Sequence, residues 1–580
     1  MSVLNKNWNI KNADPEKNVI QKLLANRGLT DKDQIQAYLS PNYKKGFHNP
    51  FVMKNMDRAV ERIKKAIADK EKIIIFGDYD VDGISGTAIL VKTLQILGAR
   101  ISYRLPHRVK DGYGLSNAFV EDFAKVGVTL VITVDCGISC KNQIALAKMH
   151  GIDVIITDHH TIPESIPDQA YAILHPGQPD CNYPFKGLTG AGVALKLASA
   201  LITDKFEGEE RDEYLFSLFD LASLGTVADI GPLQGENRII VKYGLEALKN
   251  TKWPGLQSLK ELSGVLPDEK IDINTIGFRI SPRLNAAGRI DHPYYALQLL
   301  LNDDVAKGKL LALHLEKLNQ ERQQMVIKAM IEAEEQFQKD QDHLKNGTNQ
   351  TSNGVKIFIA SSPDWHVGIL GLIAAKIAEK YTMPSMILQD FGDYLVASAR
   401  SPEFFNVVEA LTAHRDHLEH FGGHAQAAGF NIRKEKLPGF IEAMSAYAQG
   451  KLPMATVRPS LNIDCELSAD DINENLMTFL EQMEPFGVSN EQPLFLFRGV
   501  RPLLPKRVGK EQNHLHFKAE ISGQNSGSVK RIPVIAFKLG EHENMLAEGS
   551  PIDLVCHLEK NDWKGTSHLQ LRAVDFKAAE

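Results

Sequence analysis

Acidic and histidine side chains directly follow three apolar runs of the sequence. KIIIF precedes GDYDVDG, LVITV precedes DCG, and DVIIT precedes DHH. Together these segments and a later apolar stretch, FDLASLGTVA, supply Asp78, Asp80, Asp82, Asp135, Asp158, His159, His160 and Asp229. Carboxylates concentrated at one place repel one another unless protons or cations neutralise them, and carboxylate with imidazole suits manganese or magnesium. The acids suffice for two ions, which can hold the attacking and leaving oxygens of a phosphoryl displacement.

The elements that must bring these side chains together belong to an α/β architecture. From residue 71 onward, short β-branched runs alternate with helical stretches, which predicts a parallel sheet with helices on both faces. In an open parallel sheet the carboxyl ends of the strands lie along one edge, and that edge holds the ligand crevice. We therefore expect the acids to converge at this edge from distant positions in the chain.

Changes in composition divide the chain into five segments, with a polar linker at 345–354. We expect a helical N-terminal lead-in at 1–70, an α/β domain at 71–300, a connecting helix at 301–343, a second, smaller α/β domain at 355–450, and a β-rich domain at 460–580. The connecting helix is predicted because its stretch is rich in Glu, Gln, Lys, Leu and Ala and holds few breakers. The short strands and charged turns of the last segment predict a small barrel, with the OB-fold as one candidate.

The composition is that of an ordinary globular protein. Hydrophobic residues make up 43% and charged residues 24% of the 580 residues, which excludes a mainly disordered chain. No apolar run approaches the roughly 18 residues of a membrane helix. The N-terminus lacks an apolar signal core and the five cysteines form no CxxC pair, so we expect a reduced, cytoplasmic protein. A net charge of −6 does not suit a passive nucleic-acid coat, but a nucleic-acid enzyme needs only a locally basic groove.

Three simpler interpretations of the acids compete with a metal site. DxDxDG also opens an EF-hand calcium loop, but the twelfth position of that loop must be glutamate and is Ile89 here. A DxD after a strand also opens haloacid-dehalogenase-like phosphatases, whose pattern does not include an Asp-His-His at a later strand end. Any single aspartate at a strand end could cap a helix. Four clusters at matching strand ends are not explained by capping alone.

In this order, GDYDVDG, VDCGIS, TDHH and SLGTVAD resemble the motifs of the DHH phosphoesterase superfamily. Further segments resemble one branch of it, the RecJ family of single-strand-specific 5′→3′ DNA exonucleases; they are HRVKDGYGLS, SPRLNAAGRI, DWHVGILGLIAAK, SARSP and FGGHAQAAGF. The resemblance covers about Ile73 to Phe430, and the β-rich tail is similar to the OB-fold of that family. It implies a DHH domain, a DHHA1 domain and an OB-fold, in that order.

The resemblance also implies a site for two Mn²⁺ or Mg²⁺ ions. Asp80 would bind one ion and Asp82 the other, with Asp135 bridging them. His159 and Asp229 would complete the second site.

Neighbouring residues would support this site. His160 would face the scissile phosphate, and Asp158 would orient the histidines by accepting their hydrogen bonds. Asp78 is either a ligand or a support, and the sequence does not decide between the two. Phe76 stands where other branches of the superfamily, such as family II pyrophosphatases, carry a ligand histidine, which favours the exonuclease branch.

Arginines in stretches that contain glycine or proline are candidates for binding the phosphates of a nucleic acid, because arginine offers a forked donor matched to phosphate. They are Arg108, Arg279, Arg283, Arg289 and Arg400. SPRLNAAGR adds Asn285 in what we expect to be a small-residue turn. The resemblance places Arg108, Ser398 and Arg400 around a terminal 5′-phosphate, which would anchor the chain end and set the direction of hydrolysis. The alternative for each arginine is a solvated surface position.

The second α/β domain holds further candidates. GGHAQAAG, with Gly422, Gly423 and His424, is expected to be a glycine-rich turn whose backbone N–H groups cradle phosphate. His366, before a predicted helix, could touch phosphate or could only pack locally. Four histidines of one segment could suggest zinc, but no cysteine is nearby and the spacing is not that of a zinc finger; they are His414, His417, His420 and His424.

The β-rich domain offers a surface on which single-stranded DNA could stack and find positive charge. The candidate residues there are Arg498, Arg501, Lys506, Arg507, Lys510, His516 and Lys518. The alternative for each of them is a solvated position on the barrel surface.

The residues and the resemblance together predict a metal-dependent 5′→3′ exonuclease that releases 5′-mononucleotides from single-stranded DNA in repair and recombination. Two alternatives stay open at this point. One is a DHH phosphodiesterase that acts on short oligoribonucleotides or cyclic dinucleotides, and the other is a non-catalytic single-stranded-DNA-binding scaffold of replication. We expect a monomer without membrane contact, and the resemblance implies single-strand-binding protein and a RecQ-type helicase as partners.

Overall fold

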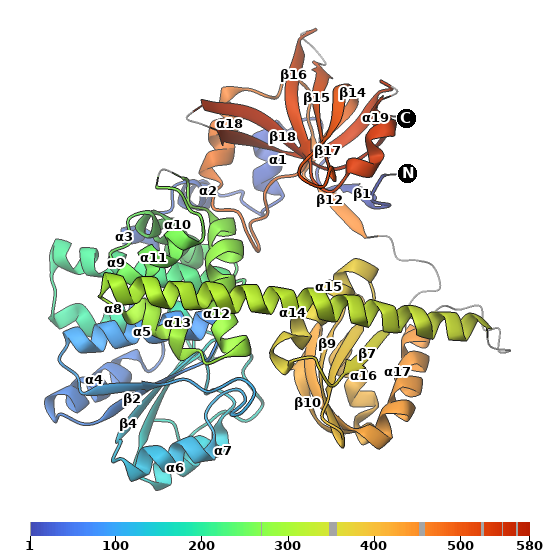
Figure 1. Ribbon diagram of the computed structural model, residues 1–580. Helices are drawn as coiled ribbons and strands as arrows, with labels where there is room; N and C mark the ends of the chain where they lie inside the picture. The colour runs from blue at the N-terminus through green and yellow to red at the C-terminus, as the bar shows by residue number, and fades with distance from the viewer. Residues whose placement is uncertain are drawn as a thin grey trace. The chain divides into compact units, whose positions relative to one another are not determined.

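The computed structural model describes residues 2–267, 269–346, 356–451, 459–523, 527–547, 549–563 and 566–579 (Figure 1). The chain forms two compact units. The larger unit comprises His48–Gly231 and Tyr243–Thr456, and the smaller unit comprises Met1–Phe47, Pro232–Lys242 and Val457–Glu580. Most of the linker predicted at 345–354 lies outside the described residues.

The larger unit contains a five-stranded parallel sheet, as the sequence predicts. Its strands are β2 (Ile73–Gly77), β3 (Ile101–Arg104), β4 (Leu130–Val134), β5 (Asp153–Thr157) and β6 (Ala172–Leu174), in the order β3-β2-β4-β5-β6. Every residue of β2 and β4 is buried, which is typical of parallel strands covered on both faces. The chain passes from β3 over β2 to β4, so the strand order changes direction between β2 and β4.

Helices pack on this sheet, and small residues let two of them approach closely. The helices are α4 (Met56–Ala68), α5 (Val81–Ile96), α6 (Asn117–Lys125), α7 (Lys141–Met149), α8 (Gly190–Leu201) and α9 (Gly208–Ala228). All of α8 and most of α5 are buried. A Cβ at Gly86 of α5 would lie only 3.2 Å from the Ala191 Cα of α8, so this glycine permits the close crossing of the two helices.

The chain is mainly helical from residue 235 to residue 301. The elements are α10 (Gly235–Lys249), α11 (Pro254–Leu262), a π-helix (Thr275–Ile280), α12 (Ser281–Ile290) and α13 (Tyr294–Leu301). SPRLNAAGRI therefore forms a helix, and the small-residue turn expected there is wrong. Pro282 lies in the first turn, where the missing N–H costs nothing. A Cβ at Gly288 would lie 2.4 Å from the Tyr79 carbonyl oxygen, so close packing, and not a turn, explains this glycine.

A single long helix, α14 (Val305–Asn346), occupies the position of the predicted connecting helix. It begins after Asp304, whose carboxylate accepts a hydrogen bond from the Lys307 N–H at 2.7 Å. It packs against α11, α12 and α13, and also against α15 and β7 of the second sheet (Figure 1). Both α/β parts of the larger unit therefore share this helix.

A second five-stranded sheet of the larger unit has the order β10-β11-β9-β8-β7. Its strands are β7 (Phe358–Ser362), β8 (Ser385–Asp390), β9 (Tyr394–Arg400), β10 (Leu418–His424) and β11 (Ala427–Arg433), with helices α15 (Val367–Tyr381), α16 (Val407–Ala413) and α17 (Leu437–Lys451). GGHAQAAG forms the end of β10 and the start of β11. The glycine-rich turn expected there is wrong, because Gly422 pairs with Gly429 and Gly423 with Ala428 in an antiparallel hairpin.

The smaller unit is built around a closed β-barrel, which agrees with the small barrel predicted for this segment. The strands β14 (Phe495–Val508), β15 (His514–Ser522), β16 (Val529–Ala536), β18 (Thr566–Ala578) and β17 (Ile552–Trp563) follow one another around it, and β17 also pairs with β14. Phe495, Phe497, Phe517 and Phe576 fill its core. The unit also contains β13 (Cys465–Glu466), α18 (Glu474–Gln482) and α19 (Glu543–Ala547).

The first residues of the chain differ from a purely helical lead-in. β1 (Asn7–Ile10) pairs in parallel with β12 (Ser460–Ile463), and α1 (Val19–Ala25), α2 (Lys32–Leu39) and α3 (Tyr43–Gly46) follow it in the smaller unit. Trp8 Nε1 donates to the buried Asp575 carboxylate at 2.9 Å, which ties β1 to the barrel. The partner strand lies near the other end of the chain, so no local pattern signals this pairing.

Among the described residues, no helix combines the length and the apolar character that a membrane span requires. All five cysteines are buried, and none of them forms a disulfide in the structure.

Candidate metal and phosphate site

The carboxyl ends of β2, β4 and β5 bring the predicted acids and histidines together. The Asp78 N–H donates to the Val134 carbonyl at 3.1 Å and the Asp135 N–H donates to the Thr157 carbonyl at 2.9 Å, so the strand ladders extend into the site. Ligand atoms lie within 4.8 Å of one another in three sets: Asp78, Asp80 and Asp135; Asp82, His159 and Asp229; and Asp135, His159 and His160. The convergence predicted from strand ends is thus present in the structure.

The N-termini of two helices hold Asp80 and Asp82. Asp80 is the N-cap of α5, and one of its oxygens accepts hydrogen bonds from the N–H groups of Asp82 and Gly83, both at 3.1 Å. The carboxylate of Asp82 accepts from the Gly190 N–H at 2.6 Å and the Ala191 N–H at 2.9 Å, at the start of α8. These donors favour the charged form, but burial and the charge of Asp80 raise the pKa of Asp82 to about 7.

Asp135 lies at the centre of the cluster on a left-handed backbone, with φ of 60°. Aspartate tolerates this region better than most residues. Gly190 makes room for it, because a Cβ there would lie 2.5 Å from the Cβ of Asp135. Burial and the charges of Asp82 and Asp80 hold the pKa of Asp135 well above its usual range. A buried carboxylate with this environment needs a cation or a proton.

His159 and Asp229 face the same centre. The Nε2 atom of His159 lies 3.1 Å from Asp135 Oδ1, 3.6 Å from Asp229 Oδ2 and 3.8 Å from Asp82 Oδ2. Burial and the neighbouring charge of His160 lower the pKa of His159 to about 4, so its imidazole is neutral and can offer a lone pair. Asp229 ends α9, and burial with the charge of Asp82 raises its pKa to about 8.

Three buried atoms of this cluster make no hydrogen bond to any part of the chain that the structure describes. They are Asp78 Oδ1, Asp135 Oδ1 and His159 Nε2. An unpaired buried polar atom costs roughly 1–3 kcal/mol, and burial, together with repulsion between neighbouring carboxylates, raises the pKa of Asp78, Asp82, Asp135 and Asp229. Divalent cations between these oxygen and nitrogen atoms would remove both costs. The residues therefore fit a centre of hard divalent ions such as Mn²⁺ or Mg²⁺.

His160 is held differently from His159. Its Nδ1 atom lies 2.8 Å from Asp158 Oδ1, and Asp158 also accepts from the N–H groups of Ile138, His159 and His160. Burial opposes charge on His160, but the hydrogen bond to Asp158 and the nearby carboxylates outweigh it and raise the pKa of His160 to about 9. Burial opposes charge on Asp158 too, but His160 and the backbone donors keep its pKa below the usual value. Asp158 thus lies in hydrogen-bond contact with the ring of His160.

Three of the predicted phosphate-binding arginines come together beside the acids. Arg108 stacks over Tyr79, with its guanidinium carbon 3.9 Å from the ring centroid, and its Nε donates to the Gly288 carbonyl at 3.3 Å. Arg289 Nη1 donates to the Gly368 carbonyl at 3.3 Å. Arg400 Nη1 donates to Ser398 Oγ at 3.1 Å. Burial and the other arginines lower the pKa of Arg289 to about 9, which indicates a crowded set of cations.

A fourth arginine, Arg322 of α14, belongs to the same cluster and is missed by the sequence analysis. It acts on Arg289 electrostatically, and burial lowers its own pKa. Arg322 Nη2 donates to the buried Asn319 side chain at 2.9 Å, while Nε has no hydrogen-bond partner in the described chain. One arginine on a long charged helix resembles its solvated neighbours, so no sequence signal marks it. We call Arg108, Arg289, Arg322 and Arg400 the arginine cluster.

Other predicted residues take different places. Arg283 of α12 forms an ion pair with Glu316 of α14, and Arg279 pairs with Glu269, so both have structural partners. Asn285 is half-buried on α12. His366 is the N-cap of α15, where its Nδ1 accepts the Gly368 N–H at 3.1 Å, as in the local-packing alternative. His424 lies at the end of the edge strand β10, with Nε2 3.3 Å from Thr161 Oγ1.

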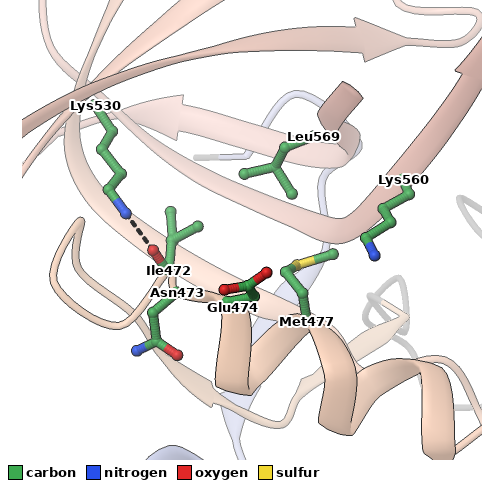
Figure 2. Close-up of a pocket in the computed structure, with 7 residues that line it drawn as sticks. All are labelled: Ile472, Asn473, Glu474, Met477, Lys530, Lys560 and Leu569. Carbon is green, nitrogen blue, oxygen red and sulfur yellow. Dashed lines mark hydrogen bonds between the residues drawn. The ribbon is translucent and has the colours of Figure 1, made fainter. Parts of the chain in front are cut away.

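A pocket of about 330 Å³ lies in the smaller unit and includes none of these residues. Figure 2 shows its lining, in which Lys530 donates to the Ile472 carbonyl beside Met477 and Leu569. Lys560 of the same pocket forms an ion pair with Glu481. Among the described residues that line it, Glu474 alone carries a carboxylate, so the pocket offers no carboxylate cluster for divalent metal ions.

Some of the basic residues predicted on the barrel surface form ion pairs with acidic residues of the barrel unit. Arg498 pairs with Glu466 and Asp553, and Arg507 pairs with Glu543. Lys506 faces His516 across β14 and β15, and Lys518 follows on the same face of β15. Burial and these two lysines lower the pKa of His516. Leu504, between the basic positions, is 78% exposed.

Three family models match the chain in the order of its domains. They are the DHH family N-terminal domain over residues 72–226, the DHHA1 domain over 354–450 and the RecJ OB domain over 463–575. The single-stranded-DNA-specific exonuclease RecJ of Bacillus subtilis (strain 168) is 36% identical over 564 residues, a match that covers 97% of this chain and 68% of the relative.

Solved structures agree with this assignment. The crystal structure of RecJ from Thermus thermophilus in complex with Mn²⁺ matches with a TM-score of 0.78 at 29% identity and covers 97% of this chain and 76% of that chain. The structure of the same protein in complex with Mg²⁺ matches with a TM-score of 0.72 at 28% identity, over 97% and 74% of the two chains. The order of the domains and the fold are those of RecJ proteins, and the sequence is 36% identical to one of them over nearly its whole length. The chain therefore belongs to the RecJ family.

Proposed function

We propose that this chain is a metal-dependent exonuclease that hydrolyses single-stranded DNA in the 5′→3′ direction to 5′-mononucleotides, in DNA repair and recombination. The observation that supports this most strongly is that the acid cluster and the arginine cluster lie next to each other in the larger unit. The carboxylates require cations to neutralise them, and the arginines can bind an anion. Tyr79 lies between Asp78 and Asp80 in the chain and carries Arg108 on its ring, so one loop joins the two groups. The activity named for the Bacillus subtilis relative agrees with this proposal.

Two Mn²⁺ or Mg²⁺ ions would be held by the acid cluster. Asp80 and Asp135, with Asp78 as a further ligand, would hold one ion. Asp82, His159 and Asp229, with Asp135 bridging, would hold the other. Bound divalent ions supply positive charge to the phosphate oxygens as negative charge develops on them.

The other residues of the site would bind, orient and move protons. Asp158 fixes His160 through its Nδ1 atom, so the Nε2 atom is available to the scissile phosphate. The buried carboxylates of Asp82 and Asp135 hold the ligand geometry rigid through their contacts with the start of α8. His160 would then donate a hydrogen bond or a proton to a phosphate oxygen.

The arginine cluster would bind the terminal 5′-phosphate, with Ser398 as an additional donor. Arginine pairs with phosphate through two parallel hydrogen bonds, and a terminal phosphate carries more charge than an internal one. Anchoring the chain end here would place the first internal phosphodiester at the acid cluster. The direction of hydrolysis would follow from this anchoring.

The remaining parts would guide the substrate. Lys506, His516 and Lys518 on the barrel, with the exposed Leu504 of β14, would contact single-stranded DNA by charge and stacking. Asn285, His366, Gly422, Gly423 and His424 would contact phosphate groups of the DNA, whereas Arg283 would act through its ion pair with Glu316. We further propose a cytoplasmic monomer that works with single-strand-binding protein and a RecQ-type helicase.

The function is tested by digesting one oligonucleotide labelled at its 5′ end or at its 3′ end, with and without Mn²⁺. We expect the 5′ label to appear at once as mononucleotide, the 3′-labelled chain to shorten gradually, and the duplex form to resist. Release of the 3′ label first would contradict the proposal. Faster cleavage of dinucleotides or cyclic dinucleotides would favour a different DHH phosphodiesterase, and binding without cleavage would favour a scaffold.

Metal binding is expected to depend on pH. The pKa of Asp82 is raised to about 7 and that of Asp229 to about 8, so without metal, in the folded state at pH 7, Asp229 is mostly protonated and Asp82 is about half protonated. Because these folded-state values exceed the unfolded ones, the stability they contribute is lost as pH rises through 7 to 8. Bound Mg²⁺ replaces the protons, so it should raise the melting temperature more at about pH 8.5 than at about pH 6. An equal increase at both pH values would contradict this linkage.

A further inference from the structure

The hydroxyl of Tyr113 touches two parts of the site. Tyr113 lies in the loop between β3 and α6, within the segment HRVKDGYGLS. Its Oη lies 3.1 Å from His160 Nδ1 and 3.2 Å from the Asp135 carbonyl oxygen. The Tyr113 and His160 rings meet edge to face, with centroids 5.4 Å apart. The side chain thus contacts both a predicted metal ligand and the histidine that would face the phosphate.

The protons in this arrangement can be assigned from what each group can donate. An ionised carboxylate only accepts, so the 2.8 Å contact of Asp158 Oδ1 with His160 places a proton on Nδ1. Tyr113 Oη can then only accept from Nδ1–H, and its own proton goes to the Asp135 carbonyl. The Nδ1–H group is therefore shared between Asp158 and Tyr113. Burial and the charge of Asp158 raise the pKa of Tyr113 far above its usual value, so the hydroxyl keeps its proton.

The loop presents Tyr113 on a defined backbone. Gly112 and Gly114 on either side both have left-handed φ values, 78° and 79°. A Cβ at Gly114 would lie 3.2 Å from Cys140 Sγ, so this turn packs directly against the start of α7. The preceding residues form a hydrogen-bonded turn, in which the Asp111 carboxylate accepts a hydrogen bond from the His107 N–H at 2.8 Å. Arg108 of the same loop joins the arginine cluster, so one loop contributes residues to both the acid cluster's surroundings and the arginine cluster.

We infer that Tyr113 is a positioning residue. Its hydroxyl holds the His160 ring with Nδ1 toward Asp158 and Nε2 toward the substrate phosphate, and it stabilises the backbone of Asp135 through the hydrogen bond to the Asp135 carbonyl. This rests on the proposed function for the role of His160. Tyr113 is 44% exposed, so its ring could instead contact a nucleotide base. The two roles differ in which part of the side chain matters, the hydroxyl or the ring.

A double-mutant cycle separates these roles. Y113F keeps the ring and removes the hydroxyl, and we expect kcat on single-stranded DNA to fall about tenfold with KM unchanged, as for one lost orienting hydrogen bond. In an H160N background, whose own loss is about 100-fold or more, Y113F should change kcat less than about twofold, because the group that it orients is gone. Y214F is the control for the loss of a tyrosine hydroxyl, since Tyr214 donates one hydrogen bond, to Thr93 Oγ1 at 3.2 Å. Y214F should keep the wild-type kcat.

The inference is overturned if Y113F turns over like the wild type while Y113A raises KM, which would assign the ring to the DNA. Additive losses in Y113F/H160N would also overturn it, since the hydroxyl would then act independently of His160. A second measurement does not depend on catalytic activity, so it tests the inference even if the proposed function is wrong. In the Mg²⁺-loaded protein, the His160 Nδ1–H proton signal, identified by its absence in H160N, should exchange faster with water in Y113F than in the wild type. Equal exchange rates would contradict the inference whatever the activity.

Discussion

Replacing Asp135 with asparagine is expected to lower kcat on single-stranded DNA by about three orders of magnitude, while the protein stays folded. Asp135 shares one ligand set with Asp80 and another with His159, so its carboxylate would touch both ions. Asparagine keeps the shape and removes the charge. Without metal, D135N should be at least as stable as the wild type near pH 8, because one of several mutually repelling buried carboxylates is gone.

The matched control is D220N. Asp220 is as buried as Asp135 and lies in the same unit, but its oxygens accept hydrogen bonds from Thr251 and Trp253 away from the cluster. We expect D220N to keep wild-type turnover and to lose stability only. Steady-state digestion and thermal unfolding with and without Mn²⁺ provide both readouts. Wild-type turnover by D135N, or Mn²⁺ stabilisation equal to that of the wild type, would exclude a bridging role for Asp135.

Replacing Arg400 with alanine is expected to lower kcat/KM on 5′-phosphorylated single-stranded DNA by one to two orders of magnitude, as for the loss of charge-assisted hydrogen bonds. On the same oligonucleotide with a 5′-hydroxyl the loss should be about threefold or less, since the anchored group is already absent. The prediction follows from the position of Arg400 beside Ser398 and from its electrostatic contact with Arg108. Competition between the two substrates measures the preference directly.

R283Q is the control for this second prediction. Arg283 lies in the same sequence motif as Arg289, but the structure pairs it with Glu316. We expect R283Q to lose some stability and to keep the preference for a 5′-phosphate. If R400A loses activity equally on both substrates, the arginine cluster does not read the terminal phosphate. If R283Q abolishes the preference, the assignment of Arg283 to helix packing is wrong.

The acid cluster could be predicted from the sequence because residues that follow the strands of a parallel sheet lie at the same edge of that sheet. Each strand of such a sheet ends at the same edge, so Asp78, Asp135 and Asp158 had to meet there. The parallel pairing of β2, β4 and β5 confirms the premise of that rule. The proposal that Asp78 is a ligand rests on the coordinates, because only they show its unpaired Oδ1 beside Asp80 and Asp135.

The residues proposed to bind phosphate could be predicted from the sequence only in part. Arg322 enters the cluster because α14 packs on α12, and its sequence context matches that of exposed helical arginines. SPRLNAAGR was expected to be a turn because glycine and proline usually interrupt helices, but Gly288 instead allows contact with the Tyr79 carbonyl. GGHAQAAG was expected to be a glycine-rich turn because of its glycines. Small side chains there permit the pairing of β10 with β11, which tertiary context decides.

The most direct test of the central claim is anomalous diffraction at the manganese edge from crystals of the wild-type protein soaked in Mn²⁺. We expect two peaks, about 3.5–4 Å apart, one contacted by Asp80 and the other by His159, with Asp135 touching both. A cluster whose carboxylates carry protons and bind no manganese, or ions found only elsewhere on the chain, would contradict the claim.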